Sequence, residues 1–263
     1  MVTSKIVGTC QFSVLTACLP ERSVYLNEAA ASVARARELV SPNELEWIIA
    51  VDGPGDLPDV TAQARVVRIE RRSGISAARN AALAFARGDL IAPLDADDTL
   101  VADGLLEAQE ALLNDHLGWI ACNRVLLSTQ GKTGHWHGRR TWQPGGLAES
   151  WSAPFAFHPN SIVVRRDLIL RCGGWPALAT NEDLFLAMLL SERAAGLSIE
   201  AVLTRYRVWD GQEVSSPSYP ATKRIAFRFI EASLNSIRRE FDRDPVTHPR
   251  PGGAYGKRAT GTR

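Results

Sequence analysis

Two absences narrow what this 263-residue chain can be. It has no excess charge of either sign, with 30 basic against 29 acidic residues, whereas a nucleic-acid surface usually shows as a basic excess. It also has no run approaching the roughly 18 apolar residues of a membrane span, and no evident amphipathic basic helix of the kind that lies on a membrane surface. We therefore expect neither nucleic-acid binding nor stable membrane insertion.

Cysteine is scarce, and its spacing fits no known framework. Cys10, Cys18, Cys122 and Cys172 are scattered without a CxxC pair, whereas zinc sites and disulfide scaffolds need closer or more regular spacing. The stretch LTAC, residues 15–18, matches a lipoprotein cleavage pattern, but the segment before it is a weak signal and overlaps the first predicted strand. We expect reduced thiols in a cytoplasmic protein.

Strands and helices alternate through the first 125 residues. Short apolar runs predict strands at 12–17, 46–51, 65–69, 90–94 and 118–123, and helical periodicity predicts helices at 24–40, 75–88 and 101–113. This alternation indicates βαβ units, and hence an α/β fold whose mostly parallel sheet is flanked by helices. Ligands of such sheets bind beyond the carboxyl ends of the strands.

The second half of the chain is less regular. It predicts a strand at 161–166, a helix at 182–195, short strands within 198–208 and a helix at 220–241. That last helix either packs on the core or forms a homodimer contact. We treat 1–241 as a single domain, and expect disorder in 242–263, which is rich in glycine, proline and arginine.

Three carboxylates, Asp95, Asp97 and Asp98, follow the apolar run LIAPL. Neighbouring carboxylates resist ionising beside one another, so the cluster needs solvent, a helix to cap or a cation. Mg²⁺ and Mn²⁺ are commonly held by one or two carboxylates together with substrate phosphates. We predict a divalent metal site, and the alternative is that Asp97 and Asp98 cap the helix that starts near Val101.

Two further motifs lie at the predicted ligand edge. Asp52 in VDGPGD could accept hydrogen bonds from a base or a ribose, or it could belong to a plain Asp-Gly turn. In RSGISAARNAAL, Arg79 and Asn80 can face the crevice, where an arginine fork suits a diphosphate; the alternative is an exposed helix arginine. No GxGxxG follows the first strand, so a nicotinamide dinucleotide is not indicated.

Glu182 and Asp183 begin an amphipathic helix in TNEDLFLAMLL. They either complement the helix dipole or supply a general base to an acceptor cleft, and their position does not separate the two. Because a helix N-terminus lowers a carboxylate pKa, we expect such a base to be weak.

The motifs VDGPGD, GISAARNAAL, GDLIAPLDADD, GGW and NEDLFL, in this order, resemble those of family 2 glycosyltransferases with the GT-A fold. The resemblance spans about Phe12 to Ser215. It implies a nucleotide-diphosphate-sugar donor, Mg²⁺ or Mn²⁺, and inversion at the anomeric carbon. It also implies a Rossmann-like nucleotide-binding half at about 10–125 and a mixed acceptor-binding half at about 126–241.

The resemblance further implies roles for single residues. Asp183 would be the catalytic base, and Asp97 with Asp95 would hold the metal. Tyr206 to Ser215 would close over the diphosphate. The residues expected to bind the donor are Thr16, Ala17, Asp52, Arg79, Asp95, Ala96 and Asp97, and those expected to support the site are Asp98, Glu182, Gly174, Trp175, Tyr206 and Arg207.

Three departures from the family pattern concern the donor. Val51 stands where many relatives carry an acid, Trp209 where they often carry histidine, and the first loop, TACLPERS, differs from the common type. The sequence therefore does not fix the donor's base, although a UDP-sugar is favoured.

The acceptor and the rival classes remain open at this stage. We favour a small-molecule acceptor such as a secondary metabolite, with a cell-envelope or surface-polysaccharide acceptor as the alternative. A sugar-nucleotide nucleotidyltransferase is disfavoured because ACLPERS has no glycine to form a phosphate loop. A catalytically silent nucleotide-sugar-binding protein is disfavoured because Asp95, Asp97 and Asp183 are all present.

Overall fold

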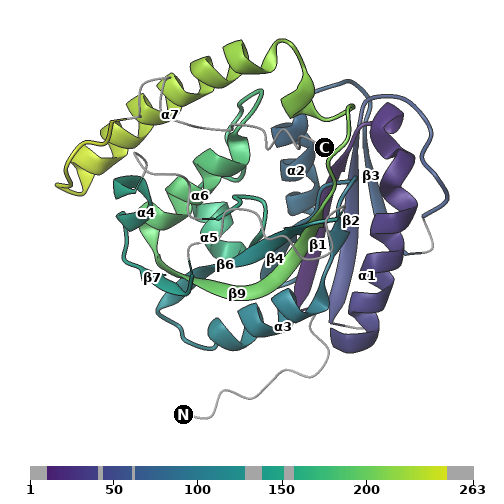
Figure 1. Ribbon diagram of the computed structural model, residues 1–263, viewed down its shortest axis with the longest axis horizontal. Helices are drawn as coiled ribbons and strands as arrows, with labels where there is room; N and C mark the ends of the chain where they lie inside the picture. Colours follow the sequence, from purple (N-terminus) through teal and green to yellow (C-terminus); the bar gives the residue numbers. More distant parts are fainter. Residues whose placement is uncertain (1–10, 41–43, 61–62, 128–137, 151–156, 248–263) are drawn as a thin grey trace, which may run out of the picture.

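One sheet runs through the computed structural model, which describes residues 11–40, 44–60, 63–127, 138–150 and 157–247. Its strands lie in the order β3-β2-β1-β4-β8-β6-β9-β5, and β7 also pairs with β9 (Figure 1). The strands are β1 (Phe12–Cys18), β2 (Leu45–Asp52), β3 (Arg65–Ile69), β4 (Leu90–Pro93), β5 (Thr99–Leu100), β6 (Leu117–Leu126), β7 (Arg140–Trp142), β8 (Ile162–Arg165) and β9 (Ala195–Tyr206).

The sheet is parallel where the sequence predicts βαβ units. Strands β3, β2, β1 and β4 are all parallel, and β6 is parallel to β9. Strand β8 lies between β4 and β6 and is antiparallel to both. The mostly parallel sheet is confirmed, and it passes without a break from the predicted nucleotide-binding half into the predicted acceptor-binding half.

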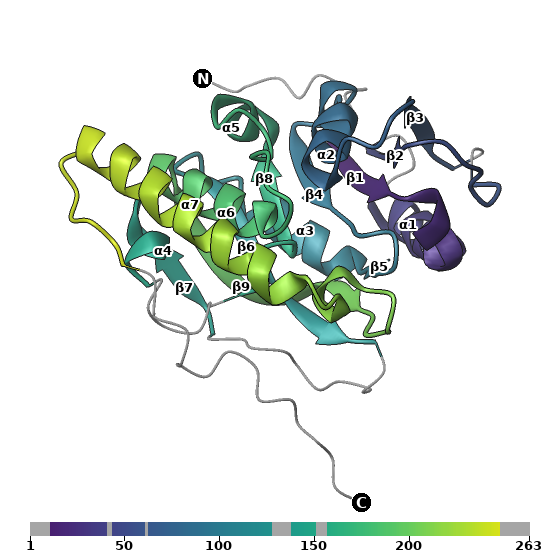
Figure 2. The ribbon, with the colours of Figure 1, turned by 90° about the horizontal axis from the view of Figure 1, so that it is seen from above.

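Helices cover both faces of the sheet. One core lies between the sheet and helices α1 and α3, and the other lies between the sheet and α2, α4, α5 and α6. Helix α7 lies outside α6, as Figure 2 shows. The helices are α1 (Leu26–Val40), α2 (Ile75–Ala84), α3 (Ala102–Ala111), α4 (Gly146–Glu149), α5 (Arg166–Arg171), α6 (Glu182–Arg193) and α7 (Tyr219–Glu240), with 3-10 turns η1 (Pro20–Tyr25) and η2 (Glu213–Ser215).

The apolar runs explain why the central strands are covered twice. In β1, Val14 belongs to the core under α1 while its neighbour Leu15 belongs to the core under α2, and both are fully buried. Successive side chains of a strand point to opposite faces, so a strand buried on both sides must be apolar at every position. None of the described helices combines the length and apolar character needed to cross a bilayer.

Helix α2 ends at Ala84, earlier than the predicted end at Gly88. The cause is a contact with strand β2, where the Glu46 carboxylate accepts the backbone N–H of Arg87 at 2.6 Å. The N–H of Gly88 donates to Ser13 Oγ at 2.8 Å. These tertiary hydrogen bonds take amide groups that would otherwise continue the helix.

The expected disorder from Asp242 onward is wrong for residues 242–247. Arg243 pairs with the buried carboxylate of Glu192 on α6. The side chain of Asn235 bonds both backbone groups of Val246, at 2.7 and 2.9 Å. Polar composition does not loosen this segment because its polar groups find buried partners. Residues 248–263 lie outside the described residues.

Candidate active site

Arg79 joins the two halves of the predicted site. Its side chain is only 3% exposed, so the alternative of an exposed helix arginine is wrong. Nη2 bonds Asp95 Oδ1 at 2.7 Å, and Nη1 bonds Glu182 Oε1. One guanidinium on α2 therefore holds the acid loop after β4 and the first residue of α6 together.

The acid loop, Asp95 to Asp98, is bound by the closing segment, Tyr206 to Ser215, rather than by α3. Asp97 Oδ2 accepts a hydrogen bond from Trp209 Nε1 at 2.6 Å, and Asp98 Oδ1 accepts one from the backbone N–H of Arg207 at 2.9 Å. Helix α3 is preceded by Val101 and receives no side-chain cap. The helix-cap explanation of these acids is therefore wrong.

Burial and mutual repulsion raise the pKa values of Asp97 and Asp98. Burial and the charge of Asp95 raise the pKa of Asp97. Burial, Asp95 and Asp97 together raise the pKa of Asp98 well above its usual range. A cation between these groups would relieve the repulsion.

Asp95 and Asp97 could hold a hard divalent cation whose coordination shell is completed by oxygens of a bound ligand. Asp95 Oδ2 and Asp97 Oδ1 accept no hydrogen bond from another described residue. Over the described ranges, no three His, Cys, Asp or Glu side chains converge as a metal site. Two carboxylates with phosphate oxygens form the usual ligand set of Mg²⁺, so the donor's diphosphate would have to supply the remaining ligands.

Asp52 closes the turn into α2. Its carboxylate accepts the backbone N–H groups of Ser73 at 2.6 Å and Gly74 at 2.9 Å, and the residue is 4% exposed. Gly74 has a φ of 91°, a left-handed conformation that favours glycine. The observed contacts are those of a turn, and a contact with the donor's base stays a prediction.

The two residues of the first loop that are expected to bind the donor, Thr16 and Ala17, differ in burial. Thr16 is fully buried, and its hydroxyl accepts a hydrogen bond from Trp47 Nε1 at 2.9 Å. The observed contact of this side chain satisfies a buried indole, and a contact of Thr16 with the donor stays a prediction. Ala17 is half-buried, and Ala96 in the acid loop is 9% exposed.

Gly174 and Trp175 pack against Asn80, the residue that follows Arg79. The Asn80 amide donates to Trp175 O at 2.9 Å and accepts from Trp175 N at 2.7 Å. Asn80 therefore fixes this turn instead of facing the crevice. The Arg79 guanidinium carbon lies 6.0 Å from the centroid of the buried Trp175 ring.

Glu182 and Asp183 have raised pKa values, contrary to the expected effect of the helix N-terminus. Burial raises the pKa of Glu182 to about 7, although Arg79 opposes the shift. Burial also raises the pKa of Asp183, and the charge of Asp95 adds to it. Loss of water therefore outweighs the helix dipole. Glu182 is committed to Arg79, whereas Asp183 bonds only its neighbour's N–H, Leu184 N, at 2.7 Å among the other described residues.

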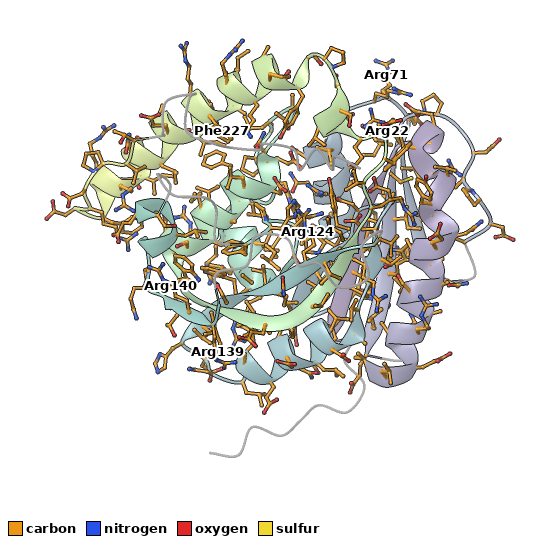
Figure 3. The ribbon with its side chains drawn as sticks, in the orientation of Figure 1. Arg22, Arg71, Arg124, Arg139, Arg140 and Phe227 are labelled. Atoms are coloured by element: carbon orange, nitrogen blue, oxygen red, sulfur yellow. The ribbon has the colours of Figure 1, made fainter. Side chains whose placement is uncertain are left out.

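Sequence reasoning missed Arg124 on β6, which lies near the centre of the molecule (Figure 3). Its guanidinium carbon lies 4.0 Å from the Tyr206 ring centroid, and its buried Nη1 has no hydrogen-bond partner within the described part of the chain. Burial lowers the pKa of Arg124, and the charges of Asp98, Asp95 and Asp183 oppose this shift. The available signal was a lone arginine two residues after the apolar run GWIAC.

The closing segment is anchored on the acid loop. Arg207 Nε donates to the backbone oxygen of Asp97 at 3.0 Å, and Nη2 donates to Glu28 Oε2 at 2.5 Å. The Tyr206 hydroxyl accepts from Gln212 Nε2 at 2.9 Å. The indole of Trp209 is a donor only, so in place of the common histidine it binds Asp97 and supplies no metal ligand.

Comparisons with known proteins concern the family and the fold of the chain. A family model described as Glycosyl transferase family 2 matches residues 13–170. The beta-monoglucosyldiacylglycerol synthase of Trichormus variabilis is 26% identical over 189 residues, which cover 62% of this chain and 39% of that protein. The chain thus spans about two fifths of the length of this curated relative.

Crystal structures of S. aureus TarS residues 1–349 have a similar fold. The complex with UDP has a TM-score of 0.62 at 17% identity, covering 88% of this chain and 70% of that chain. The complex with UDP-GlcNAc has a TM-score of 0.63 at 18% identity, covering 88% and 71%.

Proposed function

The chain belongs to glycosyl transferase family 2 and has the GT-A fold, and from this we propose that it moves a sugar from a nucleotide-diphosphate sugar to an acceptor hydroxyl, with inversion. The bridge made by Arg79 is the observation that carries the proposal. It links Asp95, on the side of the leaving group, to the Glu182–Asp183 pair, on the side of the acceptor. The TarS complexes support UDP as the nucleotide, because that protein binds UDP and UDP-GlcNAc in the same fold.

The acid loop would receive the diphosphate. Asp97 and Asp95 would hold Mg²⁺ or Mn²⁺, which when bound stabilises the negative charge that develops on the leaving group. Asp98 positions the closing segment through its hydrogen bond with Arg207. The unpartnered nitrogen of Arg124 offers a further positive contact for a phosphate or sugar oxygen.

Asp183 is the proposed general base. Its raised pKa brings it nearer the range in which a carboxylate takes a proton efficiently. It would deprotonate the acceptor hydroxyl as that oxygen attacks the face of the sugar opposite the leaving group, through an oxocarbenium-like transition state. Glu182 acts by holding Arg79, and so fixes the distance between the two sides of the reaction.

The acceptor is proposed to belong to the cell envelope, as a glycolipid or glycan hydroxyl. The sequence favoured a small secondary metabolite and kept the envelope as the alternative. The printed name of the curated relative describes a diacylglycerol glycolipid, which favours the envelope class.

Calorimetric titration of UDP, GDP and dTDP, each with and without Mn²⁺, tests the donor site. We expect Mn²⁺-dependent binding of UDP to the wild type and its loss in Asp97→Ala. The exposed acid Asp103 on α3 gives a control, Asp103→Ala, that should bind as the wild type does. Absence of metal-dependent binding for all three nucleotides would overturn the proposed metal and donor site.

Product analysis separates the rival activities. A transferase releases UDP from UDP-glucose or UDP-GlcNAc when an envelope glycolipid or glycan is present, and this release should fall at least about a hundredfold in Asp183→Asn. Formation of a sugar nucleotide from a nucleoside triphosphate and a sugar phosphate would support the nucleotidyltransferase instead. Binding of UDP-sugar without any turnover would support a silent binding protein.

A further inference from the structure

Helix α7 has two contrasting faces. Ala226, Ile230 and Leu234 are buried, and the last two belong to the core shared with α6. On the outward face, Ile225 is 70% exposed and Phe229 is 52% exposed. These two residues are four apart and so lie one above the other on the helix. The Phe229 ring also packs edge-to-face against Phe185 of α6, with ring centroids 5.9 Å apart. Ile225 and the free part of Phe229 therefore lie exposed on α7, the helix outside α6 (Figure 2).

Arginines accompany this apolar pair. Arg224 and Arg228 are exposed beside Ile225 and Phe229, and neither has an ion-pair partner among the residues that the structure describes. Arg239 is also exposed farther along the helix. The sequence after the described residues, 248–263, adds four basic residues and no acidic one. The outward face of α7 thus combines apolar and basic side chains.

The combination of apolar and basic side chains on this face of α7 indicates the kind of partner that it fits. An apolar stripe beside arginines is the pattern of helices that lie in a membrane interface, where the apolar side chains enter the boundary of the acyl chains and the cations meet lipid phosphates. We propose that the outward face of α7, defined by Arg224, Ile225, Arg228 and Phe229, docks on the surface of an anionic phospholipid bilayer.

The docked orientation brings the site toward the lipid. The Tyr219 hydroxyl, at the start of α7, interacts with the side chains of Thr180 and Asn181, which immediately precede the Glu182–Asp183 pair. A bilayer against α7 would thus lie close to the acceptor side of the proposed site. The docking itself depends only on the surface of α7 and stands apart from the proposed reaction.

Flotation with vesicles tests the docking. We expect the wild type to float with vesicles of phosphatidylcholine and phosphatidylglycerol, to float much less with phosphatidylcholine alone, and to be released by added salt. The variant Arg224→Ala with Arg228→Ala should lower the partition coefficient about 30-fold, since each basic residue near an anionic surface contributes about fivefold. Ile225→Ser with Phe229→Ser should also lower it.

A matched control comes from α1, on the opposite side of the molecule from α7 (Figure 1). Arg35 and Leu39 lie one turn apart on α1, both are exposed, and Leu39 is 66% exposed. The variant Arg35→Ala with Leu39→Ser should keep wild-type flotation. Urea unfolding of the α7 variants should match that of the wild type, because the changed side chains are exposed. This shows that the variants are folded without reference to the donor site.

Several results would overturn the proposal. Wild-type protein that floats equally with both vesicle types, or with neither, would do so, as would α7 variants that float like the wild type. Sedimentation velocity tests the alternative, that a second copy of the chain covers this face. A dimer in the wild type, a monomer in the α7 variants and no vesicle binding would assign the face to that second copy.

Discussion

Arg79 balances the charges at the centre of the site. Its guanidinium is buried and faces Asp95 and Glu182. Burial alone would lower the pKa of Arg79, but the charges of these two acids and of Asp183 raise it. A buried charge is tolerated only when it is paired and hydrogen-bonded. Lysine could not replace it, because an ammonium lacks the planar fork that spans two separated carboxylates.

The first prediction at the residue scale concerns pH. Asp183 must be ionised to act as a base, and burial raises its pKa, so kcat/KM should rise with pH through a value above the usual range of aspartate. Glu182→Gln removes one negative charge and frees Arg79 to favour the ionised form of Asp183. The acid limb of the pH–rate profile should then move to lower pH.

A control variant isolates this effect. Glu200 is an exposed acid on β9, and Glu200→Gln makes the same change of charge far from Arg79. Its acid limb should match that of the wild type. A profile in Glu182→Gln that stays in place or moves to higher pH would contradict the coupling.

The second prediction separates backbone strain from a clash at two adjacent glycines. Gly173 and Gly174 have φ values of 82° and 78°. A Cβ at Gly173 meets nothing within 4 Å, whereas one at Gly174 would lie 2.3 Å from Asn80 Oδ1. Gly173→Ala should cost about 1 kcal/mol of unfolding free energy from φ alone, and Gly174→Ala about 3 kcal/mol. Urea unfolding measures both, and equal losses would exclude a role for the Asn80 contact.

At the scale of elements, a buried ion pair joins α7 to α6. Arg238 is 1% exposed and Glu192 is fully buried, with Arg238 Nη1 2.6 Å from Glu192 Oε1. The same nitrogen donates to Gly145 O at 3.1 Å. Arg243 also pairs with Glu192, so one carboxylate holds α7 and the segment that follows it.

Removing one partner of this pair should destabilise the protein more than removing both. Arg238→Ala leaves Glu192 with less compensation and should lower the free energy of unfolding by about 3 kcal/mol, whereas Arg238→Met with Glu192→Met should cost less. The exposed neighbour Arg239 supplies the control, Arg239→Ala, with an expected change below about 0.5 kcal/mol. Urea unfolding of the four proteins gives the comparison, and a double variant less stable than Arg238→Ala would contradict it.

Elements were predictable where a continuous apolar run meets a turn residue. Strands β1, β2 and β4 satisfy this, and the carboxyl ends of β2 and β4 place Asp52 and the acid loop at one edge of the sheet. Strand β9 was predicted as short pieces because exposed Glu200 interrupts its apolar pattern. Elements as short as β5, β7, α4 and α5 carry too few residues to show a period.

The partners of the site residues were less predictable than their location. Thr16 and Asp52 lie at the predicted edge, but their side chains satisfy an indole and two backbone amides. Arg124 was missed because only the tertiary fold shows that one of its nitrogens is buried without a partner. Burial also reversed the expected direction of the Asp183 pKa, and burial is a property of the whole packed structure.

At the scale of the molecule, the two predicted halves share one sheet. Strand β8, from the second half, is the neighbour of both β4 and β6. We therefore expect the halves to unfold together. Hydrogen exchange followed by mass spectrometry should give similar opening free energies for β2 and β9. A much lower value for β9 would show that the acceptor half opens by itself.

The central place of β8 has a consequence for synthesis of the chain. A ribosome makes β4 and β6 well before Ile162–Arg165, the strand that fills the space between them. Until residue 165 has emerged, the nascent chain keeps an open strand edge on β4, and β6 waits for both β8 and β9. Open edges pair readily with other chains, so the growing polypeptide is most prone to aggregate in this interval. A chaperone that shields strand edges would protect it then, before any donor could bind.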